Sequence, residues 1–130
     1  MLRFKALKLA FASLALVAGV LTGAAQAKSP SVIEPISTIT IAELPKQGAQ
    51  TYALIHQGGP FAHAKDGVVF GNRERLLPAQ KRGFYHEYTV STPGSKNRGA
   101  KRIVCGGQPK APEICYYTAD HYASFRKIVP

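Results

Sequence analysis

Acidic residues and cysteines are both scarce in this sequence. The 130 residues include 7 Asp and Glu against 17 Lys and Arg, which gives a formal net charge of +10. The two cysteines, Cys105 and Cys115, form no Cys-x-x-Cys pair and have no His at a matching spacing, so no metal site is expected. The excess of cations indicates a polyanionic partner, either nucleic acid or the acidic surface of a cell envelope.

Long apolar runs are also lacking, except at the start of the chain. Three cations precede an apolar run from Leu9 to about Leu21, and Ala25-Gln26-Ala27 forms a small-x-small cleavage site. This run is shorter than the roughly 20 residues that a membrane-spanning helix needs, and no later segment approaches that length. The sequence therefore predicts a secretory signal peptide over residues 1–27 and a mature protein exported to the periplasm or the medium.

The mature chain has the size of one small domain. Without residues 1–27 it has 103 residues, with 14 Lys and Arg against 7 Asp and Glu. A chain of this length buries only a modest core, so a covalent cross-link would stabilise it. Because export favours oxidation and turn residues separate the cysteines, we expect a Cys105–Cys115 disulfide across a hairpin loop. Two free buried thiols are the alternative.

The pattern of apolar residues predicts one helix followed by strands. Residues 28–43 form a mature N-terminal segment in which the alternation over residues 36–41 predicts a short strand. Helix formers over residues 49–56 predict a short helix that starts near Pro45 and ends at Gly58. Four further strands are expected, over residues 85–91, 100–105, 114–118 and 123–129. The expected fold class is α+β, with one N-terminal helix packed on one face of an antiparallel sheet of four to five strands and the opposite face left open.

Residues 58–83 are expected to form a long loop with a functional role. A turn followed by solvated charges is the simpler interpretation of residues 71–74. The functional interpretation is recognition of a base, in which backbone N–H groups bond a base carbonyl and Phe70 stacks on the ring. Glu74 is then the acceptor for two hydrogens on the edge of guanine, which is the base that suits a carboxylate there.

Residues 84–104 bring an acid and several cations together. Alternation places Glu87 on the face opposite the apolar side chains of its strand, and a hairpin would bring Arg102 near it. For one such pair, a surface salt bridge is the simplest explanation. Arg98 and the C-terminal His121 complete a base, an acid and a cationic clamp for phosphate, which is the set that in-line transesterification of RNA requires.

Short motifs follow one another in a defined order between residues 44 and 128. They are Asp66-Gly67-Val68-Val69-Phe70, Asn72-Arg73-Glu74, Leu77-Pro78, Tyr85-His86-Glu87-Tyr88-Thr89-Val90, Thr92-Pro93-Gly94, Arg98-Gly99, Arg102-Ile103 and Tyr116-Tyr117-Thr118-Ala119-Asp120-His121-Tyr122. In this order they resemble the guanyl-specific microbial ribonuclease family, which contains barnase and the secreted Streptomyces ribonucleases. The resemblance identifies residues 44–130 as a ribonuclease domain with one helix on a twisted antiparallel sheet.

The resemblance also implies a role for each site residue. Glu87 is the general base, His121 is the general acid, and Arg98 and Arg102 hold the scissile phosphate. The guanine site consists of Phe70, Asn72, Arg73 and Glu74, and Tyr122 flanks the phosphate. Two features depart from the similar Streptomyces enzymes: Gly71 stands where they carry a side chain, and their terminal disulfide has no counterpart here.

The implied activity is cleavage of single-stranded RNA after guanosine, without metal or cofactor. Transesterification gives a 2′,3′-cyclic phosphate, which water then opens. The resemblance suggests a monomer and, as a partner, a small acidic inhibitor protein of the barstar type. Two alternatives stay open: a non-catalytic secreted protein that binds RNA or the envelope, and an antibacterial toxin that acts through the same ribonuclease activity. A carboxylate in the phosphate site argues against the pure binder.

Overall fold

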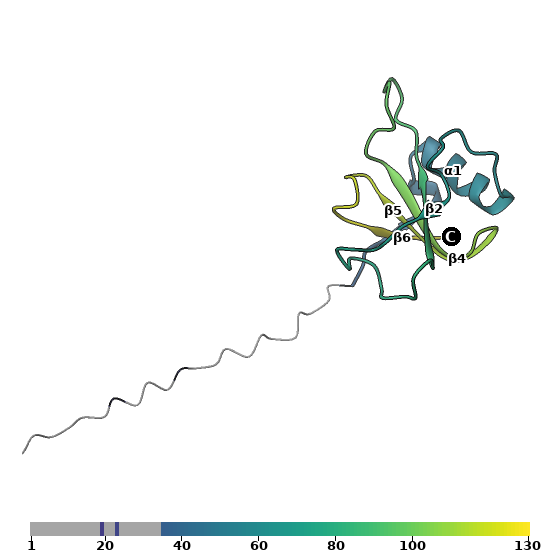
Figure 1. Ribbon diagram of the computed structural model, residues 1–130. Helices are drawn as coiled ribbons and strands as arrows, with labels where there is room; N and C mark the ends of the chain where they lie inside the picture. The colour runs from purple at the N-terminus through teal and green to yellow at the C-terminus, as the bar shows by residue number, and fades with distance from the viewer. Residues whose placement is uncertain (1–18, 20–22, 24–34) are drawn as a thin grey trace, which may run out of the picture. The chain divides into compact units, whose positions relative to one another are not determined.

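The computed structural model describes Gly19, Gly23 and residues 35–130. The predicted signal peptide, apart from these two glycines, and the start of the mature segment lie outside the described residues. Figure 1 shows a helix beside a sheet, and residues 35–130 form one α-helix and six strands. They are β1 (Thr38–Thr40), η1 (Ile41–Glu43, a 3-10 turn), α1 (Lys46–Gln57), β2 (Val68–Val69), β3 (Tyr85–Thr89), β4 (Arg102–Gln108), β5 (Ala111–Thr118) and β6 (Arg126–Val129). No helix of the described part is long and apolar enough to cross a membrane.

The predicted helix is confirmed, together with both of its ends. Pro45 stands at the N-cap of α1, where its fixed φ suits the entry into a helix. Gly58 ends the helix in the left-handed region at φ 83°, and its N–H donates to the carbonyls of Leu54 and Ile55. Glycine takes this conformation without a steric penalty, which is why it so often ends a helix.

The six strands form one mixed sheet in the order β1-β6-β5-β4-β3-β2. All neighbouring pairs are antiparallel except β1 and β6, which pair in parallel with Ile39 opposite Ile128. The predicted fold class is confirmed, but the sheet has six strands rather than four or five. The additional strand is β2, which pairs only Val68 with Glu87 and Val69 with His86 and therefore has too few residues for a detectable alternation.

The segment between the cysteines is largely strand, so its prediction as a loop is wrong. Strand β4 continues to Gln108 and β5 begins at Ala111, with an irregularity in the register at Gly106 and Gly107. Gly107 has φ 104° and donates its N–H to the Phe84 carbonyl at 3.2 Å. A Cβ at Gly106 would collide with the Phe84 ring. Gly106 and Gly107 therefore allow close packing and bending inside a hairpin, although a pair of glycines is more typical of a loop.

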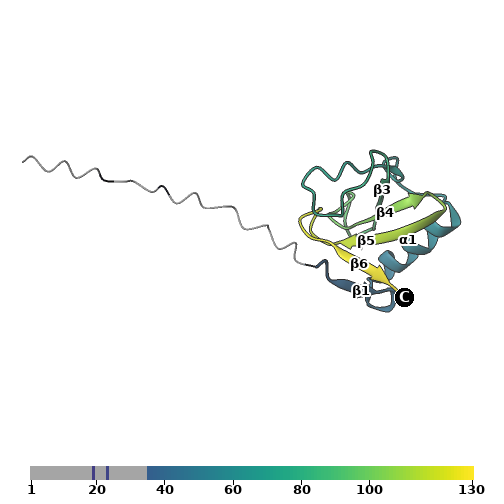
Figure 2. The same cartoon turned by 90° about the horizontal axis from the view of Figure 1, so that it is seen from below.

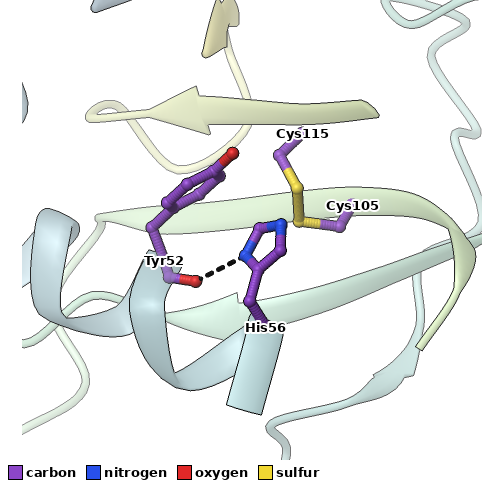
Figure 3. The surroundings of a disulfide bond; sticks show 4 residues. All are labelled: Tyr52, His56, Cys105 and Cys115. Carbon is purple, nitrogen blue, oxygen red and sulfur yellow. Dashed lines mark hydrogen bonds between the residues drawn. A yellow bond between two sulfur atoms is a disulfide. The ribbon is translucent and has the colours of Figure 1, made fainter. Parts of the chain in front are cut away.

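The predicted disulfide is confirmed. Cys105 and Cys115 are directly opposite one another on β4 and β5, with Cα atoms 4.1 Å apart and an S–S bond of 2.09 Å. Figure 3 shows the bond facing α1, beside Tyr52 and His56. The cross-link therefore lies in the layer between helix and sheet, away from the opposite face.

Apolar clusters cover both faces of the sheet. The cluster under α1, which packs across β4 and β5 (Figure 2), includes Ile39, Ile55, Tyr88, Val90, Ile103, Tyr117 and Ile128. A second cluster on the other face consists of Leu77, Tyr85, Val104, Tyr116 and Phe125. The prediction of an open second face is therefore only partly correct. Alternation directs three of these side chains away from the helix, and the segments that carry Leu77 and Phe125 cover them.

Candidate active site

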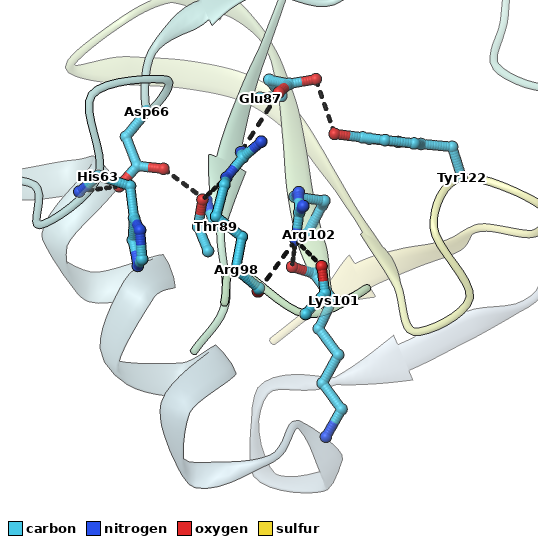
Figure 4. Close-up of polar contacts among 9 residues, drawn as sticks. His63, Asp66, Glu87, Thr89, Arg98, Lys101, Arg102 and Tyr122 are labelled. Atoms are coloured by element: carbon cyan, nitrogen blue, oxygen red, sulfur yellow. Dashed lines mark hydrogen bonds and ion pairs between the residues drawn. The ribbon is translucent and has the colours of Figure 1, made fainter. Parts of the chain in front are cut away.

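Glu87 occupies the uncovered part of the second face, in the middle of β3. Its Oε1 lies 3.5 Å from Arg98 Nη2, and its Oε2 accepts a 2.9 Å hydrogen bond from the Tyr122 hydroxyl (Figure 4). The Glu87 side chain is 13% exposed and that of Arg98 is 25% exposed. A carboxylate with two donors in partial contact with solvent remains able to accept a proton from a bound hydroxyl.

The ionic partner of Glu87 is Arg98, although the hairpin argument favoured Arg102. In the observed register, Glu87 is opposite Val104 and Thr89 is opposite Arg102, so Arg102 lies two residues further along the sheet. Arg98 reaches back from the loop after β3 and donates from Nε to Thr89 Oγ1 at 3.0 Å. The direction of a side chain in a loop cannot be inferred from strand alternation, so this contact could not be predicted from the sequence.

Arg102 is a buried cation on the same face, with 2% exposure. Its Nη1 donates to the carbonyls of Gly99 at 2.9 Å and Lys101 at 2.8 Å, as Figure 4 shows for Lys101. The guanidinium carbon lies 5.9 Å from the centre of the Tyr122 ring. Its Nε has no hydrogen-bond partner among the described residues. A buried cation held in one orientation beside Glu87 and Arg98 favours an anion at this face through its charge.

The loop after β5 positions His121 and Tyr122. Both residues have left-handed φ angles, 54° and 70° respectively, which are uncommon for side chains of this size. The His121 N–H donates to the Ala100 carbonyl at 3.0 Å, and the Tyr122 N–H donates to Thr118 Oγ1 at 3.1 Å. The exposed His121 is thereby tied to the segment between Arg98 and Arg102.

Asp120 stabilises this loop from within. Its Oδ1 accepts hydrogen bonds from Thr118 Oγ1 and from the Ser124 N–H, both at 2.9 Å. The bonds from Ser124, chiefly that of its side chain, hold the pKa of the Asp120 carboxyl below its usual range. Asp120 and Thr118 are not recognisable as supporting residues from the sequence, because their only signal is their place in the last motif.

Tyr122 is a neutral hydrogen-bond donor to the Glu87 carboxylate. Burial raises the pKa of the Tyr122 hydroxyl, and its hydrogen bond to the Glu87 carboxylate raises it further. The proton therefore stays on the phenol and points at Glu87. The Tyr122 ring also stacks on Phe70, with ring centres 5.3 Å apart, so one side chain links Glu87 to the neighbouring pocket.

A pocket of about 250 Å³ lies beside Tyr122. The recognition loop, defined as residues 70–77, forms one wall, and Tyr122 and Phe125 form the other. Phe70 offers its ring and Glu74 its carboxylate, with both Arg73 and Glu74 exposed at the rim. This volume and lining suit a flat heterocycle that lies against an aromatic ring.

Asn72 lines the pocket but uses its amide to hold the recognition loop. Its Nδ2 donates to the Leu77 carbonyl at 2.9 Å, and its Oδ1 accepts from the Leu77 N–H at 3.1 Å. Its φ of 48° is left-handed, a conformation that Asn tolerates better than most residues. The Asn72 amide therefore holds the shape of the loop, and the place of Asn72 in a guanine site stays a prediction.

Thr89 and Asp66 support the cationic clamp and were not found from the sequence. Strand β2 ends its pairing at Glu87, so the Thr89 N–H has no strand partner there. Asp66 Oδ1 accepts that N–H at 2.7 Å, while the Thr89 hydroxyl binds Arg98. Within residues 35–130, no group of three His, Cys, Asp or Glu side chains is arranged to hold a metal ion.

Comparison with known proteins identifies relatives of this chain. The model of the Ribonuclease family, described as ribonuclease, matches residues 26–129. Guanyl-specific ribonuclease Sa3 of Kitasatospora aureofaciens is 53% identical over 96 residues, which are 74% of this chain and 66% of Sa3, just under two thirds of its length. Guanyl-specific ribonuclease Sa of the same organism is 50% identical over 91 residues, 70% of this chain and 92% of Sa.

Solved structures give the same result for the fold. Ribonuclease Sa2 in complexes with mononucleotides is 44% identical with a TM-score of 0.70, covering 75% of this chain and 97% of Sa2. A structure of Sa2 with guanosine-2′-cyclophosphate has a TM-score of 0.66 at 44% identity, covering 73% and 97%. The resemblance stated from the motifs is confirmed, and the chain belongs to the ribonuclease family.

Proposed function

We infer that this chain is a guanyl-specific endoribonuclease that cuts single-stranded RNA after guanosine. The position of Glu87 carries this function: its carboxylate binds Tyr122, in the wall of the pocket, on one side and Arg98 on the other. The proton acceptor Glu87 thus lies between a site for a nucleobase and a site for a phosphate. The relatives Sa3 and Sa are named for guanyl specificity, and Sa2 has been seen with guanosine-2′-cyclophosphate.

In the first step, Glu87 removes the proton of the ribose 2′-OH. The 2′-oxygen attacks phosphorus, the bond from phosphorus to the 5′-oxygen of the next nucleotide breaks, and His121 protonates that departing oxygen. The products are a guanosine 2′,3′-cyclic phosphate end and a free 5′-hydroxyl. Glu87 leaves this step protonated and His121 leaves it neutral.

The second step reverses these two protonation states. His121 takes a proton from water, the water oxygen attacks the cyclic phosphate, and Glu87 protonates the 2′-oxygen as its bond to phosphorus breaks. The product is a 3′-phosphate, and both side chains are ready for another turnover. Because the two groups exchange roles, neither step requires a metal or a cofactor. DNA lacks the 2′-hydroxyl and is not cut by this route.

Arg98 and Arg102 stabilise the charge on the phosphorane in both steps. Arg98 is held by Thr89, and Arg102 is held by the carbonyls of Gly99 and Lys101, so both cations are positioned before substrate binds. Donors that are already oriented lose little on reaction, which makes such contacts effective in the transition state.

The pocket beside Tyr122 receives the guanine. Phe70 stacks on the base, Glu74 accepts the N1–H and N2–H hydrogens, and backbone groups of the recognition loop bind the opposite edge. Asn72 holds this loop in shape and Arg73 lies at the rim. Gly71 adds no side chain to this contact.

We further propose that the chain is exported as a monomer, with cleavage of a signal peptide after Ala27, and that a small acidic protein of the barstar type can inhibit it. The disulfide supports an oxidising compartment. The cations around Glu87 support an acidic partner. N-terminal sequencing of the exported protein should give Lys28, light scattering should give the monomer mass, and barstar added to the activity assay should reduce cleavage.

The test of the function is digestion of an oligoribonucleotide of mixed sequence with a chelator present. We expect cuts after guanosine, with 2′,3′-cyclic phosphate ends that appear first and 3′-phosphate ends that follow. Equal cutting after all four bases, or loss of activity with the chelator, would contradict the proposal. A non-catalytic RNA binder would retain the RNA without cutting it.

A further inference from the structure

A second cavity adjoins the guanine pocket at the recognition loop. Its volume is about 530 Å³. Residues 70–73 line both cavities, so the two cavities share this wall. Gly71 contributes no side chain to that wall, and its nearest neighbour beyond the adjacent residues is the Arg73 side chain. An RNA strand that leaves the guanine pocket therefore meets no side chain at Gly71.

This second cavity is strongly cationic, and we call it the basic groove. Arg73, Lys81 and Arg82 line it, all three are exposed, and its lining contains no Asp or Glu. Within residues 35–130, the one salt bridge joins Arg98 to Glu87. The three cations of the groove are therefore not neutralised by carboxylates of the described part. Val69, which is 53% exposed, adds an apolar surface to the same groove.

The side chains of strand β3 show where the groove lies relative to Glu87 and Arg98. Tyr85 borders the groove, Glu87 is the base two residues later, and Thr89 holds Arg98 two residues after that. These three side chains share one face, at a spacing of roughly 7 Å for each two residues of a strand. The groove and the cationic clamp thus lie on opposite sides of Glu87.

This order implies a direction for the RNA. The phosphate on the 3′ side of the bound guanosine lies at Arg98 and Arg102, so the following nucleotides continue away from that end. The nucleotides on the 5′ side must leave at the other end, where the guanine pocket adjoins the basic groove. Exposed cations without carboxylate partners are the usual means of binding a phosphate backbone regardless of sequence.

Resting on the proposed ribonuclease function, we propose that the basic groove is a subsite for the RNA backbone on the 5′ side of the bound guanosine. Lys81 and Arg82 bind its phosphates, and Val69 contacts a ribose or base of that segment. The enzyme therefore prefers a guanosine that follows other nucleotides over one at the 5′ end of a strand.

The test compares three substrates, GU, UUGU and GUUU, with the double variant Lys81→Gln and Arg82→Gln. The two tetranucleotides have the same length and charge and differ only in the side on which the extension lies. The variant should lower kcat/KM for UUGU roughly 2- to 30-fold at low salt, because two exposed ionic contacts are lost. It should leave GU and GUUU within about twofold, since a change below roughly 0.4 kcal/mol is typical of a distant surface charge.

Salt gives a second readout. Each phosphate contact on a single strand contributes about 0.7 to the slope of log affinity against log salt, so losing two should flatten the UUGU slope by about 1.4. A matched control, Lys46→Gln with Lys110→Gln, removes the same charge from the first turn of α1 and the β4–β5 turn. This control should change all three substrates equally and only slightly.

Each outcome bears on one of the two claims. An equal loss on GU, UUGU and GUUU, a larger loss on GUUU, or no loss on UUGU would overturn the subsite while leaving the ribonuclease function intact. Failure of the unaltered protein to cut any of the three substrates after guanosine would overturn the function itself, and the subsite with it. A thermal melt unchanged by the two exposed substitutions excludes a folding defect.

Discussion

Replacement of Tyr122 by Phe removes one oxygen atom from the candidate active site and leaves its packing in place. The lost atom is the donor of the 2.9 Å hydrogen bond to Glu87 Oε2. The ring that stacks on Phe70 at 5.3 Å and lies 5.9 Å from the Arg102 guanidinium is retained. The substitution therefore separates the orientation of the Glu87 carboxylate from the shape of the pocket beside Tyr122.

The size of the effect follows from the contact. A hydrogen bond to a charged group contributes roughly 1.5–3 kcal/mol when it is protected from water. Because the Glu87 side chain is 13% exposed, water replaces part of the lost bond, and we expect a loss of roughly 1–2 kcal/mol. This corresponds to a decrease in kcat of about 5- to 30-fold. The affinity for guanosine 3′-monophosphate should change less than twofold, because the stacking surface is unchanged.

The assay is steady-state cleavage of GU by four proteins: the unaltered chain, Tyr122→Phe, Glu87→Ala and the double variant. If the phenol acts through the carboxylate, Tyr122→Phe should have almost no further effect once Glu87 is absent. The reasoning is refuted if the loss is the same with and without Glu87, or if the binding of the monophosphate falls as far as kcat does.

Four further outcomes are expected. The variant His121→Ala should slow RNA cleavage roughly 10²- to 10⁴-fold, but should slow a substrate whose leaving group needs no proton much less; equal losses would remove His121 from the role of acid. The variant Glu74→Gln should reduce the preference for guanine over the other bases, measured as a ratio of kcat/KM values, while general affinity for RNA persists; an unchanged ratio would contradict the assignment. Replacing Cys105 and Cys115 with Ser should lower the free energy of unfolding by about 2–3 kcal/mol and Tm by roughly 10–20 °C, with the activity at 25 °C retained. A Tm within a few degrees of the unaltered protein would count against this prediction. Burial, with a smaller contribution from Tyr116, raises the pKa of Tyr85 from 10.0 to about 12. The protonated phenol therefore contributes roughly 2–3 kcal/mol to the free energy of unfolding below pH 10, and this contribution is lost as pH rises through 12. Urea unfolding across this range should show the free energy of unfolding fall, and a flat profile would refute the assignment.

The helix and the central strands were predictable because each has a local signal. Pro45 and Gly58 mark the ends of α1, and the alternation of aromatic and β-branched residues marks β3. The parallel pairing of β1 with β6 has no such signal, since it joins residues about 90 positions apart in the sequence. Likewise, Gly and Pro between the cysteines indicated a loop, although Gly106 is there because the Phe84 ring lies against it.

The motifs proposed the members of the site, whose roles stay predictions, but they did not give the contacts between these side chains. The motifs named Glu87, Arg98, Arg102, His121 and Tyr122. Figure 4 shows Glu87, Arg98, Arg102 and Tyr122 close together on one face of the sheet, and the His121 N–H donates to the Ala100 carbonyl, between the two arginines. Which arginine contacts the carboxylate depends on the path of a loop, and the internal bonding of Asn72 depends on the fold of residues 70–77. Such contacts follow from tertiary geometry, which local sequence patterns do not encode.

The carbonyls around Arg102 limit how the protein can be altered. The guanidinium that is proposed to meet the phosphate is also the centre around which the backbone of residues 98–101 is wrapped. A shorter side chain at this position would release that segment, including Arg98 at its start and Ala100, to which His121 is tied. The stability of this segment and the proposed contact with phosphate therefore depend on the same side chain. An inactive but fully stable reference protein is better made by replacing Glu87 than by replacing Arg102.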